Sequence, residues 1–202
     1  METVAPVFLE TIKWDGSAYR NLPLHEERLK RTFRKYFRRD PGFRLAEALP
    51  ANPGPGLIRT RLVYSEDSQS VATLPYVFPA IQNAALIDSD VYYGEKFLDR
   101  ESLNALKAKT RADEIIIVKE GLLTDSSIAN LVFAGRDGQL YTPEPPLLFG
   151  VKRAALLRAG KVRTRAIRPC DLREFEWLSF VNAMIDLEDE IRIPTQAIWP
   201  RP

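Results

Sequence analysis

Tight-turn dipeptides recur between short apolar runs along this chain, so any strand in it must be short. Asp15-Gly16 separates the runs Val7–Trp14 and Ser17–Arg20, and such a dipeptide between two strand-like runs predicts a β-hairpin at the start of the fold. Other runs with strand character cover Leu57–Tyr64, Ser70–Phe78, Glu114–Lys119, Ile128–Ala134, Gln139–Thr142, Val162–Ile167 and Trp177–Val181.

Three segments carry helical patterns. Residues Leu24–Arg38 place apolar side chains at helical spacing, Arg100–Lys109 forms a second candidate, and a third begins after Gly150 and stops at Gly160. The sequence therefore predicts a mixed α+β / α/β fold. We expect a small α+β lobe over residues 1–82, a connection over 83–95, and a C-terminal α/β lobe over 96–202.

Charge and composition exclude several classes of function. Basic and acidic residues number 29 and 27, which gives a net charge of +2, and 45% of residues are hydrophobic. This balance favours a globular protein without a nucleic-acid or membrane partner. The basic stretch Arg28–Asp40 has aromatic residues at helical spacing and is typical of a helix with one solvated face. No apolar run has the length of a membrane span, and we expect a cytoplasmic protein.

Cysteine and histidine are too scarce to support a metal centre. Cys170 is the only cysteine and His25 the only histidine. A disulfide framework within one chain is excluded, and no metal site is expected. We expect His25 to pack at the start of its helix, with a supporting role near a functional site as the other possibility.

Five motifs follow one another in an order that carries a resemblance. They are "HEERL" at 25–29, the lone lysine of "YYGEKFLDR", "ADEIIIVKEGLLTDSSIANLVF", "YTPEPPLLFGVKR" and "FVNAM". In this order the chain resembles the class IV aminotransferases, the fold-type IV pyridoxal-phosphate enzymes that include D-amino acid aminotransferase, branched-chain aminotransferase and 4-amino-4-deoxychorismate lyase. The resemblance implies two small lobes with the active site between them, and pyridoxal 5′-phosphate as the cofactor.

The resemblance also assigns roles to individual residues. Lys96 would form the Schiff base and move the proton at the substrate carbon, and Asp125 would face the pyridine nitrogen and keep it protonated. Many relatives have glutamate in the position of Asp125. Arg28 would hold the phosphate, together with backbone N–H groups at Val151 and Lys152 where a helix begins.

The remaining candidates have two readings each. Asn182 lies where the family places a third phosphate contact, but it can equally be a buried structural amide. Arg59 and Arg61 share one face of an expected strand. That face either clamps a substrate carboxylate or is simply the solvated side of a sheet.

The reaction is not decided by these residues. The main hypothesis is amino-group transfer between an amino acid and a 2-oxo acid. Within the family, the alternative is the lyase that splits 4-amino-4-deoxychorismate into 4-aminobenzoate and pyruvate. A hypothesis of a different class is a catalytically degenerate member that serves as a scaffold. The partners we expect are a small-molecule substrate and a second copy of the chain in a homodimer.

Overall fold

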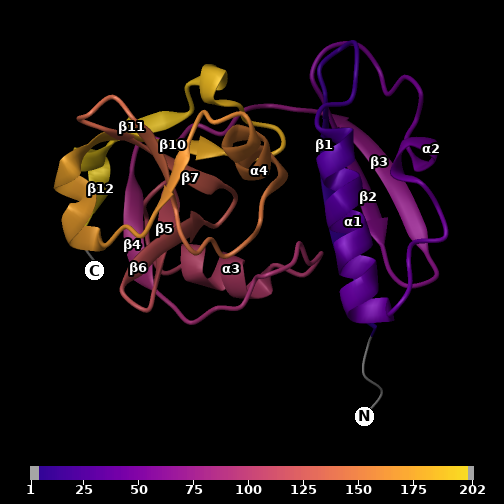
Figure 1. The fold of residues 1–202 in the computed structure, drawn as a ribbon, viewed down its shortest axis with the longest axis horizontal. Helices are drawn as coiled ribbons and strands as arrows, with labels where there is room; N and C mark the ends of the chain where they lie inside the picture. Colours follow the sequence, from indigo (N-terminus) through magenta and orange to yellow (C-terminus); the bar gives the residue numbers. More distant parts are fainter. Residues whose placement is uncertain (1–4, 200–202) are drawn as a thin grey trace. The chain divides into compact units, whose positions relative to one another are not determined.

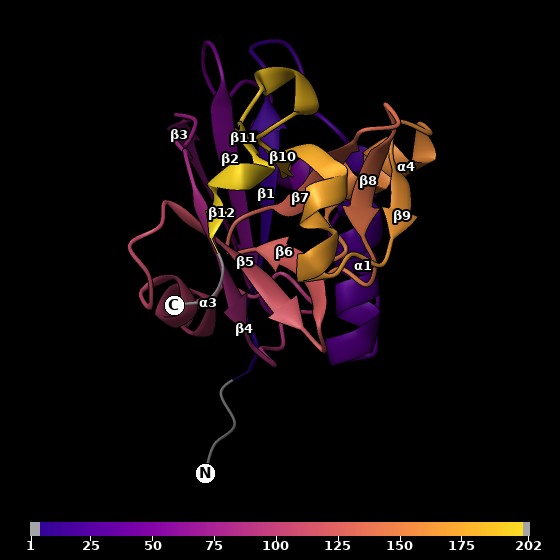
Figure 2. The same ribbon diagram turned by 90° about the vertical axis from the view of Figure 1, so that its left-hand side faces the viewer.

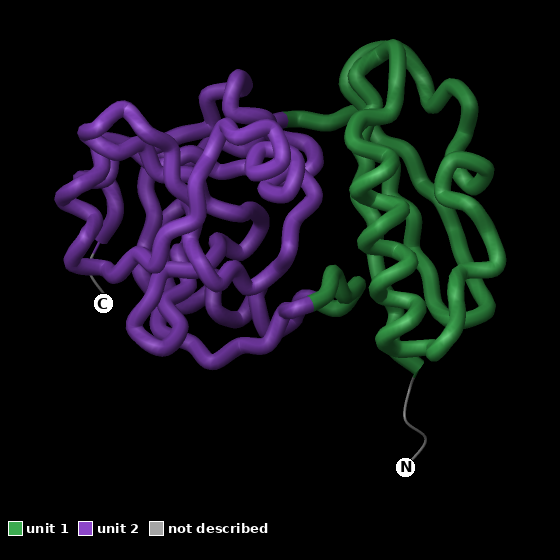
Figure 3. Tube along the Cα trace, in the orientation of Figure 1, with its two compact units in different colours: residues 1–77, 95–99 green, residues 78–94, 100–202 purple. Residues whose placement is uncertain are grey.

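The structure is a computed structural model that describes residues 5–199. The chain divides into two compact units, shown in different colours in Figure 3. Unit 1 contains the described residues up to Val77 together with Glu95–Asp99, and unit 2 contains Phe78–Gly94 and the described residues from Arg100 onward. The division differs from the expected one because a five-residue piece containing Lys96 belongs to the first unit.

Unit 1 is a three-stranded antiparallel sheet with one long helix packed on it (Figure 1). Its strands follow the order β1-β2-β3. Phe8 and Ile12 of β1 pack against Leu29 and Phe33 of the helix α1, so one face of the sheet and one stripe of the helix form its core. The elements are β1 (Phe8–Trp14), α1 (Leu22–Phe37), the short helix α2 (Leu45–Ala48), β2 (Ile58–Tyr64) and β3 (Gln69–Pro75).

The segment around Lys96 extends this sheet. The backbone N–H of Leu9 donates to the Lys96 carbonyl at 2.9 Å, and the N–H of Leu98 donates to the Val7 carbonyl at 2.9 Å. Phe8 and Phe97 form an antiparallel bridge. The backbone of Lys96 is therefore held by β1, although this strand lies far from Lys96 in the sequence.

The predicted hairpin at Asp15-Gly16 is wrong in its second strand. Gly16 does adopt a left-handed φ of 97° in a tight turn, but beyond the turn only a single bridge joins Trp14 to Tyr19. Strand β1 instead pairs along its whole length with β2. The register of β2 places Leu62 and Tyr64 in the core beside Phe8 and Ile12, which the short run after Gly16 cannot do.

Unit 2 is built on a nine-stranded mixed sheet. Its main path runs β11-β10-β7-β6-β5-β4-β12, with β8 and β9 paired beyond β7. The β4–β5 and β4–β12 pairs are parallel, and the rest of the main path is antiparallel. The strands are β4 (Ala84–Asp88), β5 (Glu114–Lys119), β6 (Leu122–Ser126), β7 (Asn130–Gly135), β8 (Leu140–Pro143), β9 (Arg163–Arg165), β10 (Phe175–Val181), β11 (Arg192–Pro194) and β12 (Ile198–Trp199).

The two faces of this sheet have different cores. One face gathers side chains from every strand of the main path into a single apolar cluster that includes Ile116, Phe133 and Phe180. The other face is covered by helices, with α3 (Glu101–Lys107) over β4 and β5 and α4 (Val151–Arg158) over β7 and β10. Figure 2 shows the strands of this sheet from the side. Short 3-10 helices complete the described part of the unit: η1 (Pro169–Glu174), η2 (Leu187–Asp189) and η3 (Thr195–Ala197).

Four strands of the described chain lie where the sequence analysis expected none. Strand β4 falls inside the expected connection 83–95, β6 contains Asp125 and ends in a turn, and β11 and β12 lie beyond the last expected strand. The turn itself starts at Ser126, whose hydroxyl accepts the N–H groups of Ile128 and Ala129. Among residues 5–199, no helix has the length and apolar character needed to cross a membrane.

Candidate active site

In unit 1, Arg28 is held by a buried glutamate that the sequence analysis did not single out. Glu10 is fully buried, and its carboxylate accepts the Arg28 Nε–H at 2.8 Å and the Nη2–H at 2.5 Å. Burial raises the pKa of Glu10, but the Arg28 charge and the hydrogen bond from His25 outweigh it and lower the pKa to about 2. Glu10 is therefore ionised, and it fixes the plane of the Arg28 guanidinium.

His25 is the third member of this cluster. Its Nδ1 lies 2.6 Å from Glu10 Oε2, and because the ionised carboxylate can only accept, Nδ1 must carry the proton. Burial lowers the pKa of His25, and the charges of Arg28 and Lys96 act in the same direction, against the hydrogen bond and charge of Glu10. Burial thus favours the neutral ring, and the Nε2 atom is buried without a hydrogen-bond partner among the described residues.

The structure therefore brings two predicted site residues together in unit 1. Lys96 is close enough to His25 to influence its pKa, and Arg28 shares Glu10 with that histidine. Helix α1 supplies His25 and Arg28 one turn apart, strand β1 supplies Glu10, and the segment paired with β1 supplies Lys96. His25 packs in the first turn of α1, as expected, and a supporting role at the site stays a prediction.

In unit 2, Asp125 is a buried carboxylate on β6. Its Oδ1 accepts a hydrogen bond from the Asn130 amide at 2.7 Å, and its Oδ2 accepts the Leu148 N–H at 2.8 Å. Burial raises the pKa of Asp125 to about 6, although both of these hydrogen bonds and the charge of Arg153 act in the opposite direction. A positive group beside this carboxylate would therefore be strongly favoured.

Asn130 connects Asp125 to the start of helix α4. Its amide also donates to the Leu148 carbonyl at 2.9 Å. A Cβ atom on Gly150 would lie 1.9 Å from Asn130 Oδ1, so only glycine fits at this point. The side chain of Asn130 thus occupies the space beside the Gly150 Cα.

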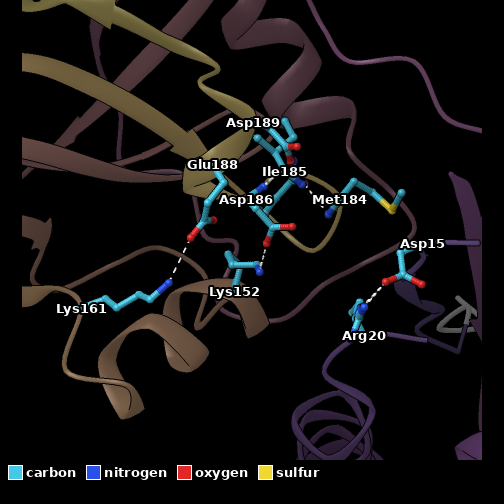
Figure 4. Close-up of polar contacts among 10 residues, drawn as sticks. Asp15, Arg20, Lys152, Lys161, Met184, Ile185, Asp186, Glu188 and Asp189 are labelled. Carbon is cyan, nitrogen blue, oxygen red and sulfur yellow. Dashed lines mark hydrogen bonds and ion pairs between the residues drawn. The ribbon is translucent and has the colours of Figure 1, made fainter. Parts of the chain in front are cut away.

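The start of α4 has the features of an anion site without a side-chain cap. Gly150 is the N-cap residue, no side chain caps the helix, and its first turn has no acidic residue. The first backbone N–H groups, at Val151 and Lys152, have no acceptor within the helix. The Lys152 ammonium forms an ion pair with Asp186, drawn in Figure 4. The side chain of Lys152 is thus engaged in its own unit.

Asn182 is hydrogen-bonded within the turn after β10. Its amide donates to the Ile128 carbonyl at 3.1 Å, and its oxygen accepts the N–H groups of Met184 and Ile185 at 2.8 and 3.1 Å. These bonds fit the reading as a structural amide. Its contact with a cofactor phosphate stays a prediction.

Arg59 and Arg61 lie on one face of β2, as strand alternation predicts. The residues between and around them, Ile58, Thr60 and Leu62, are buried, whereas both arginines are partly exposed. The two guanidinium groups therefore lie on the side of the sheet opposite α1.

Comparison with known proteins identifies the family. Residues 97–187 match the family described as amino-transferase class IV. The chain is 35% identical, over 189 residues, to an uncharacterized protein of Haemophilus influenzae strain Rd, which covers 89% of this chain and 97% of that protein. The chain therefore belongs to the class IV aminotransferase family, whose members are fold-type IV enzymes that use pyridoxal 5′-phosphate.

Solved structures share the fold along most of the chain. A Haemophilus somnus 129PT protein, provisionally named 4-amino-4-deoxychorismate lyase, is 32% identical with a TM-score of 0.79, and the match covers 90% of this chain and 98% of that one. A Mycobacterium tuberculosis protein described as a hypothetical aminotransferase, solved with pyridoxal phosphate bound, is 19% identical with a TM-score of 0.77. That match covers 98% of this chain and 84% of the other.

The residues present fit this cofactor. Asp125 is a carboxylate whose pKa is raised by burial, and a protonated pyridine nitrogen beside it would favour its ionised form. Glu10 accepts two N–H groups of Arg28 and so fixes the orientation of its guanidinium, a group suited to binding phosphate. The uncapped start of α4 provides backbone N–H groups for phosphate oxygens.

Sequence reasoning missed Glu10 and Asn130. A signal was available for each: Glu10 alternates with Phe8 and Ile12 on the apolar face of a strand, and Asn130 begins the apolar run "NLVFAG". A lone polar residue at a core position usually has a specific polar partner. The identity of the partner required the structure.

Proposed function

We propose that this chain is a pyridoxal-phosphate-dependent 4-amino-4-deoxychorismate lyase, which releases 4-aminobenzoate and pyruvate. The observation that supports this reaction is the 32% identity to the Haemophilus somnus protein, along almost the full length of both chains. The buried Asp125 and the Arg28–Glu10 pair support cofactor binding.

In this proposal the predicted residues divide the binding of the cofactor between its phosphate and its pyridine nitrogen. Arg28 binds the phosphate together with the N–H groups of Val151 and Lys152, and Asn182 lies close to the same group. Asp125 holds the proton on the pyridine nitrogen. When bound, the cofactor withdraws electrons from the substrate carbon that carries the amine.

Lys96 performs the proton transfers. Its Nζ removes the proton from the amine-bearing carbon, the ring-to-oxygen bond of the side arm then breaks, and the six-membered ring becomes aromatic. The departing enolpyruvate takes up a proton and becomes pyruvate, so no oxidant and no second substrate are needed. Electron pairs and protons balance within one molecule of substrate.

Amino-group transfer between an amino acid and a 2-oxo acid is the second candidate. It is favoured by the description of the matched family, which names that activity. The same residues would serve it, since Lys96 again moves a proton at the amine-bearing carbon. The difference is that amino-group transfer needs a 2-oxo acid as a second substrate to accept the amino group.

One experiment separates the candidates. The cofactor-loaded enzyme is mixed with 4-amino-4-deoxychorismate in the absence of any 2-oxo acid, and separately with single amino acids. Equal amounts of pyruvate and 4-aminobenzoate, at many turnovers per enzyme, are the expected result. Lys96→Ala should abolish turnover and the covalent, borohydride-reducible cofactor bond, whereas Lys109→Ala, which removes an exposed lysine of unit 2, should behave as wild type.

Other outcomes would reject the proposal or its assignment of the lysine. Conversion of the bound cofactor to its amino form by an amino acid alone, without pyruvate from 4-amino-4-deoxychorismate, would establish transamination. A bound cofactor with no change in either assay would favour the scaffold reading. A Lys96→Ala variant that still forms a reducible bond would mean that another lysine is the active one.

A further inference from the structure

The backbone turns sharply at Lys96. The N–H group of Phe97 donates to the Glu95 carbonyl at 3.0 Å, a bond that closes a γ-turn with Lys96 as its central residue. The Lys96 carbonyl itself accepts the Leu9 N–H at 2.9 Å. The lysine therefore lies in a tight turn whose backbone is fixed to β1.

The residue before Lys96 is held by helix α1. Glu95 is only 9% exposed. Its Oε1 accepts a hydrogen bond from the Lys35 ammonium at 2.7 Å, and its Oε2 accepts one from the Tyr36 hydroxyl at 3.1 Å. Both donors lie at the C-terminal end of α1, so each oxygen of this nearly buried carboxylate has a partner from the same end of one helix.

The residue after Lys96 contacts the same tyrosine. The rings of Phe97 and Tyr36 meet edge to face with their centroids 5.9 Å apart. Both rings also pack on Phe8 of β1, with centroid distances of 5.1 and 4.8 Å. Tyr36 thus holds the turn on both sides of the lysine, Glu95 through its hydroxyl and Phe97 through its ring. We call Tyr36, Glu95 and Phe97 the lysine clasp.

The clasp explains how a flexible side chain is placed. A lysine amine sits on a four-carbon stem, and the rate at which it attacks a bound aldehyde depends on how closely its backbone holds it to the reactive position. We propose that Tyr36 and Glu95 are positioning residues that aim Lys96 at the aldehyde of the cofactor. The inference rests on the proposed function for the identity of the reactive lysine, but it is the same for the lyase and for amino-group transfer.

The two partners of Glu95 differ in weight. The Lys35 side chain is 50% exposed, and ion pairs in contact with solvent contribute little. The Tyr36 hydroxyl donates to a carboxylate that is nearly buried, and a charge-assisted hydrogen bond of this kind is stronger than a neutral one. Tyr36 should therefore matter more than Lys35.

The test uses two cofactor forms that differ in the aldehyde. Pyridoxine 5′-phosphate has the phosphate and the pyridine ring but no aldehyde, so its affinity for the cofactor-free chain, measured by calorimetry, reports the non-covalent contacts alone. Pyridoxal 5′-phosphate also bonds to the lysine. The rate of this bonding is followed by absorbance, and peptide mapping after borohydride reduction identifies the lysine.

The variants of the clasp should affect only the second measurement. We expect Glu95→Ala to slow covalent bonding about tenfold, because the turn loses its hold on α1. Tyr36→Phe keeps the ring and loses the hydroxyl, and it should slow bonding about threefold. The affinity for pyridoxine 5′-phosphate should stay at the wild-type value in both.

Conservative and matched variants complete the set. Glu95→Gln keeps an oxygen that can accept the Tyr36 hydroxyl, so it should recover most of the rate lost in Glu95→Ala. Lys35→Gln should bond at nearly the wild-type rate. Its matched control is Lys30→Gln, which changes another lysine of α1, 45% exposed and paired with Glu26, and should also behave as wild type.

Each failure has its own signature. Wild-type rates of bonding to Lys96 in both Glu95→Ala and Tyr36→Phe would overturn the inference and leave the proposed function intact. A parallel loss of affinity for pyridoxine 5′-phosphate would also overturn it, because the contacts would then support the whole site and not the lysine. Reduced cofactor on another lysine of the wild type would reject the role of Lys96 and the inference together. Slowed bonding to Lys96 in a protein that fails both reaction assays would uphold the inference and reject the proposed reaction alone.

Discussion

At the scale of single residues, Asp125 makes stability depend on pH. Its pKa is raised by burial from 3.8 to about 6, so between these values the folded chain holds a proton that the unfolded chain has released. Stability should therefore fall as pH rises from 4 to 6, by about 3 kcal/mol at most, and stay level above pH 7.

The measurement is the free energy of unfolding of the cofactor-free wild type minus that of Asp125→Asn, followed across pH 4 to 7. We expect this difference to decline with pH. Bound cofactor should flatten the decline, because a protonated pyridine nitrogen favours the carboxylate. A constant difference without cofactor would show that Asp125 does not titrate in this range.

Glu10 gives a second prediction at this scale. Glu10→Gln removes the charge that orients Arg28 and that fixes the proton on His25 Nδ1. Breaking such a buried pair should cost about 3 to 5 kcal/mol of stability and weaken cofactor binding. Because His25 is the only histidine, the ¹⁵N spectrum of histidine-labelled protein reports its tautomer directly.

In the wild type we expect one protonated nitrogen, Nδ1, and in the variant a mixture of tautomers. Glu47→Gln changes an exposed acid of the same unit and should alter none of these readouts. An unchanged histidine spectrum in Glu10→Gln would contradict the assigned role of this carboxylate.

Sequence and structure agree unevenly at the residue scale. Lys96, Arg28 and Asp125 were proposed because their motifs occur in a known order, and their roles stay predictions. In the structure Arg28 and His25 share Glu10, and Lys96 influences the pKa of His25. The partners that hold them were not found. A hydrogen bond such as Asn130 to Asp125 depends on the pairing of β6 with β7, which no local pattern fixes.

At the scale of elements, Gly150 couples strand β7 to helix α4. In Gly150→Ala the new methyl group would overlap Asn130 Oδ1, which would have to move away from Asp125 and Leu148. We expect a loss of about 1 to 3 kcal/mol in the free energy of unfolding. Chemical denaturation checks it, with Gly42→Ala as control, since nothing lies within 4 Å of a Cβ at Gly42.

Helices were easier to predict than strand partners. Helix α4 ends as expected: Gly160 has a φ of 65°, and the Lys161 N–H bonds back to the Leu156 carbonyl, a Schellman motif. Strand β4 was missed because "AALID" is five residues long and, as a central parallel strand, shows no alternation. The prediction of a hairpin after β1 was wrong because the strand that pairs with β1 is the one that completes the buried core, and not the one that follows the nearest turn.

At the scale of the whole molecule, we predict a homodimer. Several large apolar side chains of the described chain remain exposed, namely Leu74, Val77, Tyr92, Leu98, Phe149 and Trp199. Exposed apolar surface of this kind favours association. Sedimentation equilibrium at micromolar concentration should give twice the chain mass of 23.0 kDa, and an active monomer would contradict the prediction.

The segment Glu95–Asp99 is part of unit 1 although its neighbours on both sides belong to unit 2. The chain therefore passes between the units three times, and the piece that carries Lys96 pairs with the edge of β1. A cut after Val77 would leave β1 and this piece on separate fragments, so they would pair only between two chains. The complete first unit, with Lys96 beside β1, therefore requires the chain up to Asp99.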